Sequence, residues 1–327
     1  ISQNLQNASS SNNGALSSRE VTSKLLPSNQ DIYPYAHELP YYINDSDMQF
    51  NNNEEEVPLK KILFWNPRKG WDYTVGQDLF KRCHVSSCIG TINRSEYNYK
   101  ELGAVVFLMH PRKPPMDEVP LQRWPGTRYI FLQQESPIYT QPLEKYDGFF
   151  NWTMTFRLDS DVPIRYGYTL KRSSYLQEVD NRAKNLKDKK LVAWMVSHCK
   201  TRSQRGKYVR DLRKYIPVDI YGRCGTLKCP KDNFDECRTM INEDYKFYLA
   251  FENSICKDYV TEKFFETLQY GPVPVVWGGA DYKQLAPPKS FINVQDFDSP
   301  RALADFIHYL DRNDTAYNMY YIHRKPY

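Results

Sequence analysis

The apolar pattern is most regular in one stretch of the C-terminal third of the chain. Alternating aromatic and aliphatic residues predict a buried strand over Lys246–Glu252, and a polar loop comes after it. Apolar residues at helical spacing then predict a helix that is capped by Asp258 or Thr261 and that ends at Gly271. A second apolar run, Val273–Trp277, predicts another strand. Strand, helix and strand in this order predict a parallel βαβ unit.

Shorter apolar runs predict the other elements of the chain. Strands are expected at 61–65, 103–110, 128–134, 149–152, 190–197, 218–221 and 291–294, and helices at 206–215, 302–310 and from 317 onward. Apolar strands that alternate with helix-sized segments are typical of parallel sheets, so the chain is expected to have an α/β fold.

The N-terminal part has a different composition. Residues 1–57 are rich in Asn, Ser and Gln, and they predict a flexible stem. The length of 327 residues suits two domains, which we place at 58–175 and 176–327 with a charged link at 175–190. No run of about 18 apolar residues and no signal-peptide pattern occurs, so a membrane anchor is expected only outside this sequence.

Charge restricts the class of ligand only a little. The net charge of +5 suits an anionic nucleotide, but it fits a solvated basic surface equally well. The sequence has no basic stripe with interleaved aromatic residues, which disfavours nucleic acid as a partner.

The cysteines are interpreted as disulfide partners in an oxidising lumen. Their spacing does not match a zinc ribbon, and the histidines are not placed to complete a metal site. The candidates are Cys83, Cys88, Cys199, Cys224, Cys229 and Cys237, with Cys199–Cys237 and Cys224–Cys229 as the expected pairs. Glycosylation sequons occur at Asn7, Asn44, Asn93, Asn151 and Asn313. Of these, Asn151 is expected to be too buried for modification, because it stands beside Trp152.

The βαβ unit also carries candidate chemistry. Ligands of open α/β sheets bind beyond the carboxyl ends of the strands, where helices begin. This edge carries Glu252, Asn253, Tyr259, Glu262 and Lys263. A helix N-terminus and a lysine suit a phosphate, while carboxylates and an amide suit hydroxyl groups. The unit therefore predicts a site for a phosphorylated sugar, with an ordinary βαβ unit and surface charges as the alternative.

Two further loops come after predicted strands. The loop 198–205 is rich in hydrogen-bond donors and suits a pyrophosphate, although a basic surface loop has the same composition. Glu135 stands just past the strand 128–134, where a sheet exposes functional groups. A solvent-exposed loop glutamate is the alternative interpretation.

Several segments resemble one known family. FYLAFENS, KDYVTEKFFETL and GPVPVVWGG together are similar to the signature of the α1,3-fucosyltransferases, glycosyltransferase family ten. QQESP resembles the acceptor-domain motif of that family, whose glutamate is the catalytic base, and this role falls on Glu135. The resemblance covers about 60–327. It implies the GT-B architecture, in which two Rossmann-like domains with parallel sheets face a cleft. The acceptor is then expected on the first domain and GDP-fucose on the second.

The family chemistry implies an inverting transfer of L-fucose from GDP-β-L-fucose. Glu135 would take the proton of the acceptor hydroxyl, while Arg205, Lys263 and a helix N-terminus would stabilise the departing diphosphate. The implied GDP-fucose-binding residues are Ser197, His198, Arg202, Arg205, Tyr221, Tyr248, Glu252, Asn253, Tyr259, Glu262 and Lys263. No cofactor is required in this scheme. Asp159-Ser-Asp161 is a weak metal motif, and a divalent cation is expected only to stimulate turnover.

The acceptor is implied by other segments. GWDYTVGQDLF and HPRKPP look most like the core fucosyltransferases of invertebrates and plants. These attach fucose to O3 of the innermost asparagine-linked GlcNAc of N-glycans, so a type II membrane protein of the Golgi lumen is expected. A Lewis-type enzyme that acts on outer N-acetyllactosamine stays open, although the insert 223–237 departs from vertebrate enzymes of that type. A sugar-binding protein that has lost catalysis is the alternative from another class. Family members carry cysteines in a C-terminal tail past the position of Tyr327, and these are the expected partners of Cys83 or Cys88.

Overall fold

The computed structural model describes residues 58–67, 75–81, 83, 85–109, 123–140, 143–169, 186–228 and 234–322. The chain divides into two units, Ile1–Leu39 and Pro40–Tyr327, and all described residues belong to the second unit. The predicted stem and most of the predicted link at 175–190 lie outside the described residues.

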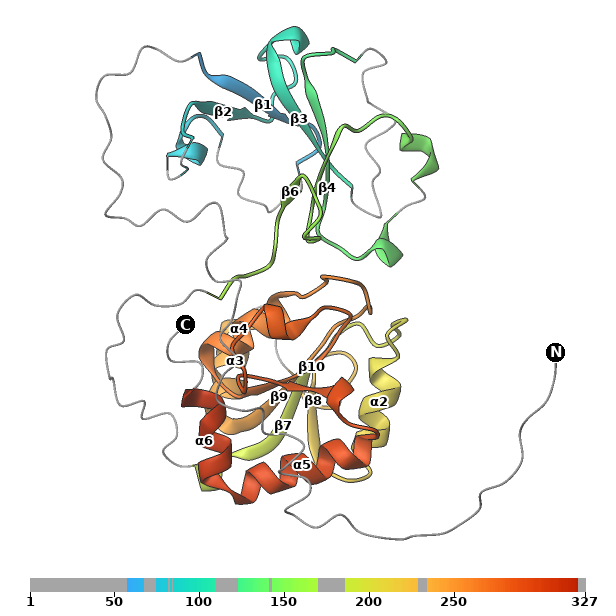
Figure 1. The fold of residues 1–327 in the computed structure, drawn as a ribbon, viewed down its shortest axis with the longest axis vertical. Coiled ribbons are helices and arrows are strands. Elements are labelled where there is room, and N and C mark those ends of the chain that lie inside the picture. The colour runs from blue at the N-terminus through green and yellow to red at the C-terminus, as the bar shows by residue number, and fades with distance from the viewer. Residues whose placement is uncertain are drawn as a thin grey trace, which may run out of the picture. The chain divides into compact units, whose positions relative to one another are not determined.

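The first sheet has six parallel strands in the order β2-β1-β3-β4-β5-β6 (Figure 1). The strands are Lys60–Phe64 (β1), Cys88–Thr91 (β2), Leu102–Leu108 (β3), Arg128–Gln133 (β4), Trp152–Thr155 (β5) and Val162–Pro163 (β6). Successive side chains of a strand point to opposite faces. Phe107 and Tyr129 therefore belong to one apolar cluster, while Val106 and Ile130 belong to another.

The second sheet has five parallel strands in the order β11-β10-β9-β7-β8. The strands are Lys190–Met195 (β7), Val218–Tyr221 (β8), Tyr245–Phe251 (β9), Val273–Trp277 (β10) and Ile292–Asn293 (β11). The chain runs from β7 to β8 on one side and from β9 to β11 on the other. The order therefore reverses between β7 and β9, which is where ligands of such sheets bind.

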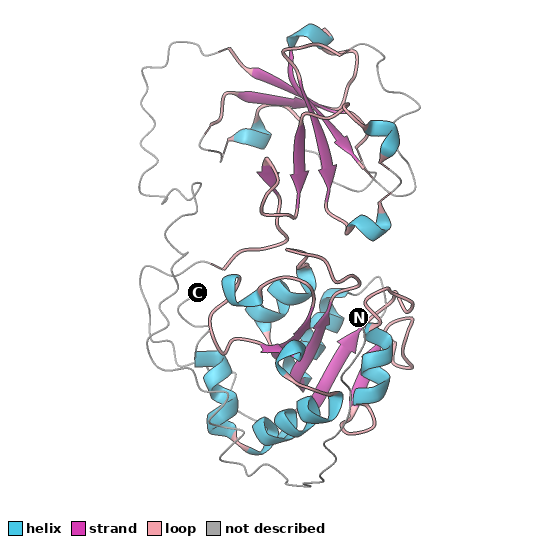
Figure 2. Ribbon diagram, turned by 45° about the vertical axis from the view of Figure 1, so that its right-hand side comes forward, coloured by secondary structure: helices cyan, strands magenta, loops and turns pink. Residues whose placement is uncertain are grey.

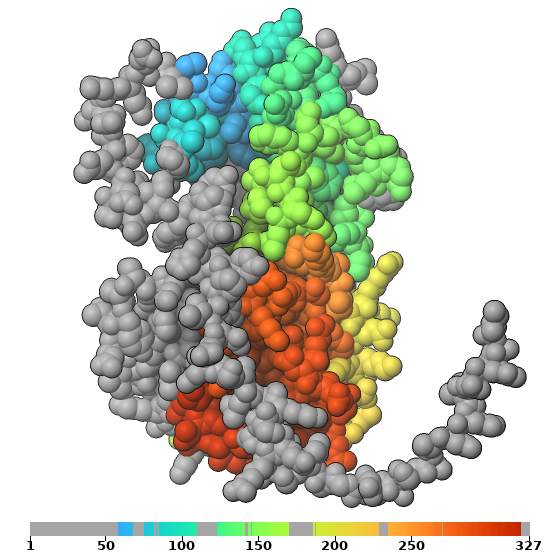
Figure 3. All heavy atoms as spheres, in the orientation of Figure 1, coloured from blue at the N-terminus to red at the C-terminus, as the bar shows by residue number. Residues whose placement is uncertain are grey.

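Helices cover both faces of the second sheet (Figure 2). They are Arg205–Leu212 (α2), Phe234–Asp244 (α3), Glu262–Tyr270 (α4), Pro300–Arg312 (α5) and Asp314–Ile322 (α6). Residues of α2, α5 and α6 share one apolar cluster with the strands, and residues of α3 and α4 share the other. In the space-filling view, α2 (yellow) and α5 (red) form neighbouring parts of the surface, in line with their packing against each other (Figure 3).

Strand β9 lies at the centre of this arrangement. All of its residues are buried, and they alternate between the two faces. Phe247, Leu249 and Phe251 pack with α2, α5 and α6, while Tyr248 and Ala250 pack with α3 and α4. A strand with helices on both faces is largely apolar, which explains the continuous apolar run at 247–251. The exception in β9 is Lys246, whose Nζ lies 2.6 Å from Asp311 Oδ1.

The predicted α/β fold with two parallel sheets is confirmed, and most strands lie within one or two residues of their predicted positions. Three corrections are needed. The strand expected at 149–152 begins only at Trp152, because Phe149 and Phe150 pack as a loop against Phe107. The short strands β2 and β6 were not predicted. Helix α3 was not predicted either, and only its first four residues, 234–237, overlap the insert at 223–237.

Candidate functional site

Glu252 comes directly after β9 and lies at the N-terminus of α4. Its carboxylate is fully buried, and it accepts hydrogen bonds from the Thr261 N–H at 2.9 Å and the Thr261 hydroxyl at 3.0 Å. Thr261 is the predicted N-cap residue, but its hydroxyl binds Glu252 and caps no N–H group of the helix. Burial raises the pKa of Glu252, and the positive charge of Lys263 opposes this effect. The buried carboxylate thus connects the end of the strand to the start of the helix.

Lys263 provides a cation at the same point. Its Nζ lies 2.7 Å from Thr261 Oγ1, 3.0 Å from Glu262 Oε1 and 3.5 Å from Glu252 Oε2. Burial acts to lower the pKa of Lys263, but the two carboxylates outweigh it and the pKa lies above its usual value. Lys263 is therefore charged at neutral pH. Its side chain is 23% exposed, and it lies at the positive end of the α4 dipole, where an anion is favoured.

A cavity of about 170 Å³ lies beside this cluster. Four of the predicted residues line it: Ser197, Tyr248, Glu262 and Lys263. They come from the end of β7, from β9 and from the first turn of α4. The structure thus brings together residues that are up to 66 positions apart in the sequence, counted from Ser197 to Lys263.

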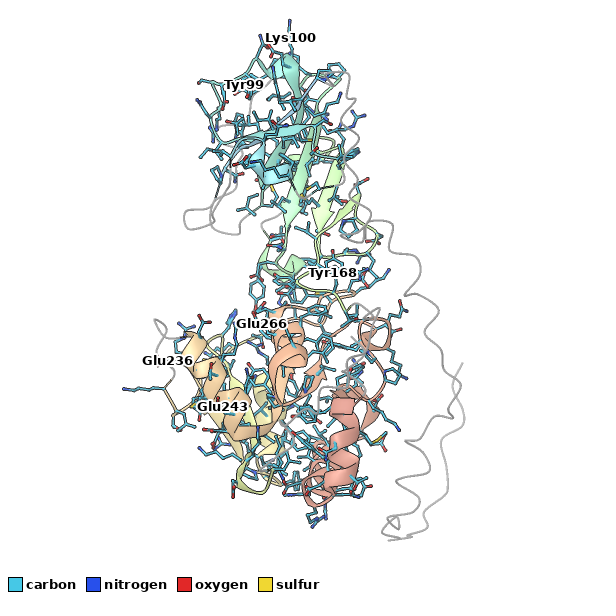
Figure 4. All side chains as sticks on the ribbon, turned by 90° about the vertical axis from the view of Figure 1, so that its left-hand side faces the viewer. Tyr99, Lys100, Tyr168, Glu236, Glu243 and Glu266 are labelled. Atoms are coloured by element: carbon cyan, nitrogen blue, oxygen red, sulfur yellow. A yellow bond between two sulfur atoms is a disulfide. The ribbon has the colours of Figure 1, made fainter. Side chains whose placement is uncertain are left out.

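The other residues that line this cavity were not predicted, and three of them carry a charge or an amide. Arg238 and Asn242 come from α3, and Glu266 comes from the second turn of α4. The two helices lie side by side, and Glu266 is on the side of α4 toward α3 (Figure 4). Arg238 Nη2 lies 2.9 Å from Glu266 Oε2. Burial raises the pKa of Glu266, and Arg238 opposes this. The spacing of Cys237 and Ile241, one helical turn apart, is the signal in the sequence from which α3 could have been predicted.

Arg205 was predicted to bind the nucleotide, and its position is at the point where the strand order reverses. It begins α2, and only 4% of it is exposed. Its Nη1 donates to Phe251 O at 2.6 Å and its Nη2 donates to His198 O at 3.2 Å. Burial lowers its pKa, and Glu252 opposes this. Arg205 therefore connects the ends of β7 and β9, and its direct contact with a ligand stays a prediction.

The predicted donor-rich loop comes after β7. Ser197, His198 and Arg202 are exposed there, and His198 Nδ1 lies 3.4 Å from the Tyr139 hydroxyl. A disulfide between Cys199 and Cys224 joins this loop to the segment after β8, with Cα atoms 5.3 Å apart.

The expected disulfide pairs Cys199–Cys237 and Cys224–Cys229 are therefore wrong. Cys237 is disulfide-bonded as well, but it lies on α3 in the apolar cluster with Ala193 and Ile241, away from the exposed Cys199. Cys83 and Cys88 carry free thiols, so their expected pairing with a C-terminal tail stays a prediction.

Two other residues that were predicted to bind GDP-fucose, Tyr221 and Asn253, lie in different surroundings. Tyr221 is buried, and its hydroxyl lies 2.8 Å from that of Tyr245, which donates in turn to Asp219. This hydrogen bonding suits a role in the core, and a ligand contact of Tyr221 stays a prediction. Asn253 is half-buried, and its Oδ1 has no hydrogen-bond partner among the described residues. A buried acceptor without a partner suits a ligand hydroxyl.

Glu135, the predicted base, lies two residues past β4 and is exposed. Its backbone N–H donates to Gln133 Oε1 at 3.2 Å. Its Oε2 accepts a hydrogen bond from the hydroxyl of Tyr259 at 3.2 Å, and Tyr259 lies in the loop between β9 and α4. Tyr259 itself is almost fully buried. The structure thus places the predicted base next to the loop that carries the Glu252 and Lys263 cluster.

The two carboxylates of the acidic motif at 159–161 bind residues of their own segment. Asp159 binds the guanidinium of Arg157, which lowers the pKa of Asp159, and Asp161 accepts from the N–H and the hydroxyl of Thr153. No group of three or more His, Cys, Asp or Glu residues suited to a metal ion occurs within the described ranges. Among the helices that the structure describes, none combines the length and the apolar character needed to cross a bilayer.

The glycosylation candidates also differ in their surroundings. Asn93 is exposed. Asn151 is exposed too, so the expectation that it is buried is wrong, but its Oδ1 accepts from Tyr129 N at 2.6 Å. Asn313 lies between α5 and α6, and its Oδ1 accepts from Ala316 N. Asn7 and Asn44 lie outside the described residues.

Comparison with known proteins shows the family. "Fucosyltransferase, N-terminal" matches residues 58–167, and "Glycosyltransferase family 10 (fucosyltransferase) C-term" matches residues 185–327. The chain belongs to the glycosyltransferase family 10 fucosyltransferases. A Drosophila melanogaster α-(1,3)-fucosyltransferase C is 36% identical to it over 82% of this chain and 69% of its own length. A Bos taurus 3-galactosyl-N-acetylglucosaminide 4-α-L-fucosyltransferase is 39% identical over 81% of this chain and 71% of its own length.

A second Drosophila melanogaster relative, glycoprotein 3-α-L-fucosyltransferase A, is 37% identical over 91% of this chain. The chain spans 59% of the length of that relative. Among solved structures, an α1,3-fucosyltransferase with GDP-fucose superposes with a TM-score of 0.57 at 17% identity, covering 84% of each chain. This likeness shows the shared fold, with two parallel α/β sheets.

Proposed function

We propose that this protein transfers L-fucose from GDP-β-L-fucose to O3 of the innermost asparagine-linked GlcNAc of N-glycans. The observation that carries the proposal is the group of residues around Lys263 at the start of α4, which we call the lysine cluster. There Lys263 is held by Thr261, Glu252 and Glu262 beside a cavity of about 170 Å³. A lysine and a helix N-terminus together favour a diphosphate, which supports the start of α4 as the site of the nucleotide sugar.

The reaction needs a proton acceptor and a stabilised leaving group. In our proposal, Glu135 takes the proton of the acceptor hydroxyl as its oxygen forms the bond to C1 of fucose. The bond from C1 to the diphosphate oxygen breaks in the same displacement, so the configuration at C1 inverts. The charge that develops on the diphosphate is met by Lys263 and the N-terminus of α4.

The donor would lie across the point where the strand order reverses. The diphosphate then sits at Lys263, and the nucleoside part extends into the cavity along Tyr248 and Glu262. Asn253 and Ser197 would order hydroxyl groups of the donor. Arg205 would fix the ends of β7 and β9 relative to each other through its hydrogen bonds to His198 O and Phe251 O.

The acceptor proposal rests on a relative. The printed name of the Drosophila glycoprotein 3-α-L-fucosyltransferase A concerns glycoproteins, and the match extends over 91% of this chain. A Lewis-type reaction on outer N-acetyllactosamine is the second candidate, because the Bos taurus 4-α-L-fucosyltransferase named above is of similar identity. A Golgi location with an N-terminal anchor outside this sequence belongs to the same proposal.

One incubation tests donor, acceptor and linkage together. The protein is mixed with GDP-fucose and either an N-linked core glycopeptide or free N-acetyllactosamine, and products are analysed by mass and linkage. We expect one added fucose at O3 of the innermost GlcNAc of the glycopeptide. Transfer to lactosamine alone would favour the Lewis-type reaction. Binding of GDP without any transfer would favour a sugar-binding protein that has lost catalysis.

A further inference from the structure

The exposed carboxylate of Glu135 is held by a buried group. Tyr259 donates its hydroxyl to Glu135 Oε2 at 3.2 Å, although only 1% of Tyr259 is exposed. Burial, together with the negative charge of Glu135, raises the pKa of Tyr259. The hydroxyl therefore keeps its proton at physiological pH and acts as a donor.

The ring of Tyr259 is held by aromatic neighbours. Phe156 meets it edge to face with ring centroids 4.9 Å apart, and Tyr166 meets it with centroids 6.5 Å apart. The hydroxyl of Tyr166 donates to Gln134 O at 2.9 Å, one residue before Glu135. The tyrosine hydroxyl thus approaches the carboxylate from a ring with little freedom to rotate.

The next residue along the chain is fixed by the same loop. Ser136 and Ser254 are both fully buried, and their hydroxyl oxygens lie 2.7 Å apart. Ser254 and Tyr259 both belong to the segment between β9 and α4. This segment runs from Glu252 to Thr261, so it contains two residues of the lysine cluster and leads directly to the other two, Glu262 and Lys263.

We propose that Tyr259 is a positioning residue that orients the Glu135 carboxylate for proton removal. Through Tyr259, the loop that leads into the lysine cluster also sets the direction of the Glu135 carboxylate. This inference rests on the proposed function, and it differs from the prediction that the Tyr259 hydroxyl binds GDP-fucose. The single proton of that hydroxyl is already donated to Glu135.

The first test is Tyr259→Phe in the full chain. Phenylalanine keeps the ring and its packing against Phe156, so the variant is expected to fold, which its melting temperature checks. We expect kcat for fucose transfer to fall roughly 10- to 100-fold, because a misplaced catalytic group loses that much rate. The KM for GDP-fucose and the calorimetric Kd of GDP are expected to stay within about threefold of wild type, as for a residue that acts on the chemical step.

A double mutant separates this role from others. If Tyr259 acts through Glu135, then adding Tyr259→Phe to Glu135→Gln should lower kcat no further, because the base is already gone. Tyr282→Phe is the matched control. Tyr282 is equally buried, and its hydroxyl has no partner within the described part of the chain, so its removal should leave kcat unchanged.

Three outcomes would overturn the inference. The first is a wild-type kcat for Tyr259→Phe. The second is clearly weaker GDP binding by Tyr259→Phe, which would make Tyr259 a ligand contact. The third is a loss that multiplies in the Glu135→Gln background. If instead the wild-type chain neither binds GDP nor transfers fucose, the proposed function itself fails.

Discussion

Glu135 and Glu252 are the same residue type at comparable places, yet their environments are opposite. Glu135 lies just past β4 in the first sheet, and Glu252 lies just past β9 in the second. Glu135 is exposed and accepts a hydrogen bond from Tyr259. Glu252 is fully buried, with Thr261 and Lys263 as its donors.

The difference comes from the segment after each strand. After β9 the chain returns into α4, which packs on the sheet and buries the carboxylate against its own N-terminus. After β4 the chain enters a short 3₁₀ helix at Pro137–Tyr139 with no buried residues. The buried carboxylate is bound by three donors of its own chain, whereas the exposed one stays accessible from solvent. The strand end alone therefore does not decide a glutamate's role.

The largest expected effect is on the exposed glutamate. Glu135→Gln keeps the shape of the side chain but cannot accept a proton, so kcat should fall roughly 10²- to 10⁴-fold, the usual contribution of a general base. GDP binding by calorimetry and the melting temperature should match wild type. A variant that retained near-full turnover would break the comparison, because Glu135 would then be an ordinary loop residue.

The loss of the cation beside the buried Glu252 should lower the stability of the protein. Lys263→Met removes the cation and leaves the buried Glu252 charge without its partner. We expect the free energy of unfolding to fall by about 2–3 kcal/mol, below the full cost of breaking a buried pair because Lys263 is 23% exposed. Denaturant titration measures this, and calorimetry should show weaker GDP binding.

A matched double variant sharpens that result. Glu252→Gln combined with Lys263→Met removes both charges, so it should regain part of the stability while GDP binding stays weak. Stability that falls further in the double variant would mean that the ion pair is not what the carboxylate needs.

A smaller effect on stability is expected where Gly279 lies against the backbone of Cys256. A Cβ on Gly279 would lie 2.7 Å from Cys256 O in the loop after Glu252, so Gly279→Ala must displace backbone. We expect a loss of roughly 1–3 kcal/mol in the free energy of unfolding. Gly103→Ala in the first sheet is the control, because its Cβ would meet Lys61 O at an ordinary 3.6 Å. Equal melting temperatures for the two variants would contradict this expectation.

The smallest effect concerns pH. Burial acts to raise the pKa of Glu262, but Lys263 outweighs it and the net pKa lies below its usual value. A lowered folded-state pKa stabilises the protein above the unfolded value, near pH 4.3, and this contribution disappears as the pH falls. The stability difference between wild type and Glu262→Gln should therefore shrink from about pH 6 to pH 3. Both proteins retain Glu252, so its own titration largely cancels. A constant difference over this range would show that Lys263 does not favour the charged form.

The sequence by itself determined the unit β9-α4-β10, most other strands and the position of Glu135 at a strand end. These features depend on apolar periodicity and turn residues within windows of a few residues, so local pattern is sufficient. The family resemblance added the roles of individual residues, and the family itself is confirmed by the comparisons.

Only the tertiary structure decided which residues share a site. It placed Arg238 of α3 in the cavity, joined Cys199 to Cys224, buried Arg205 between two strand ends, and set Tyr259 against Glu135. The last contact joins residues 124 positions apart. No local pattern encodes such a pair, because it forms only when the packing of two sheets brings their strand ends together.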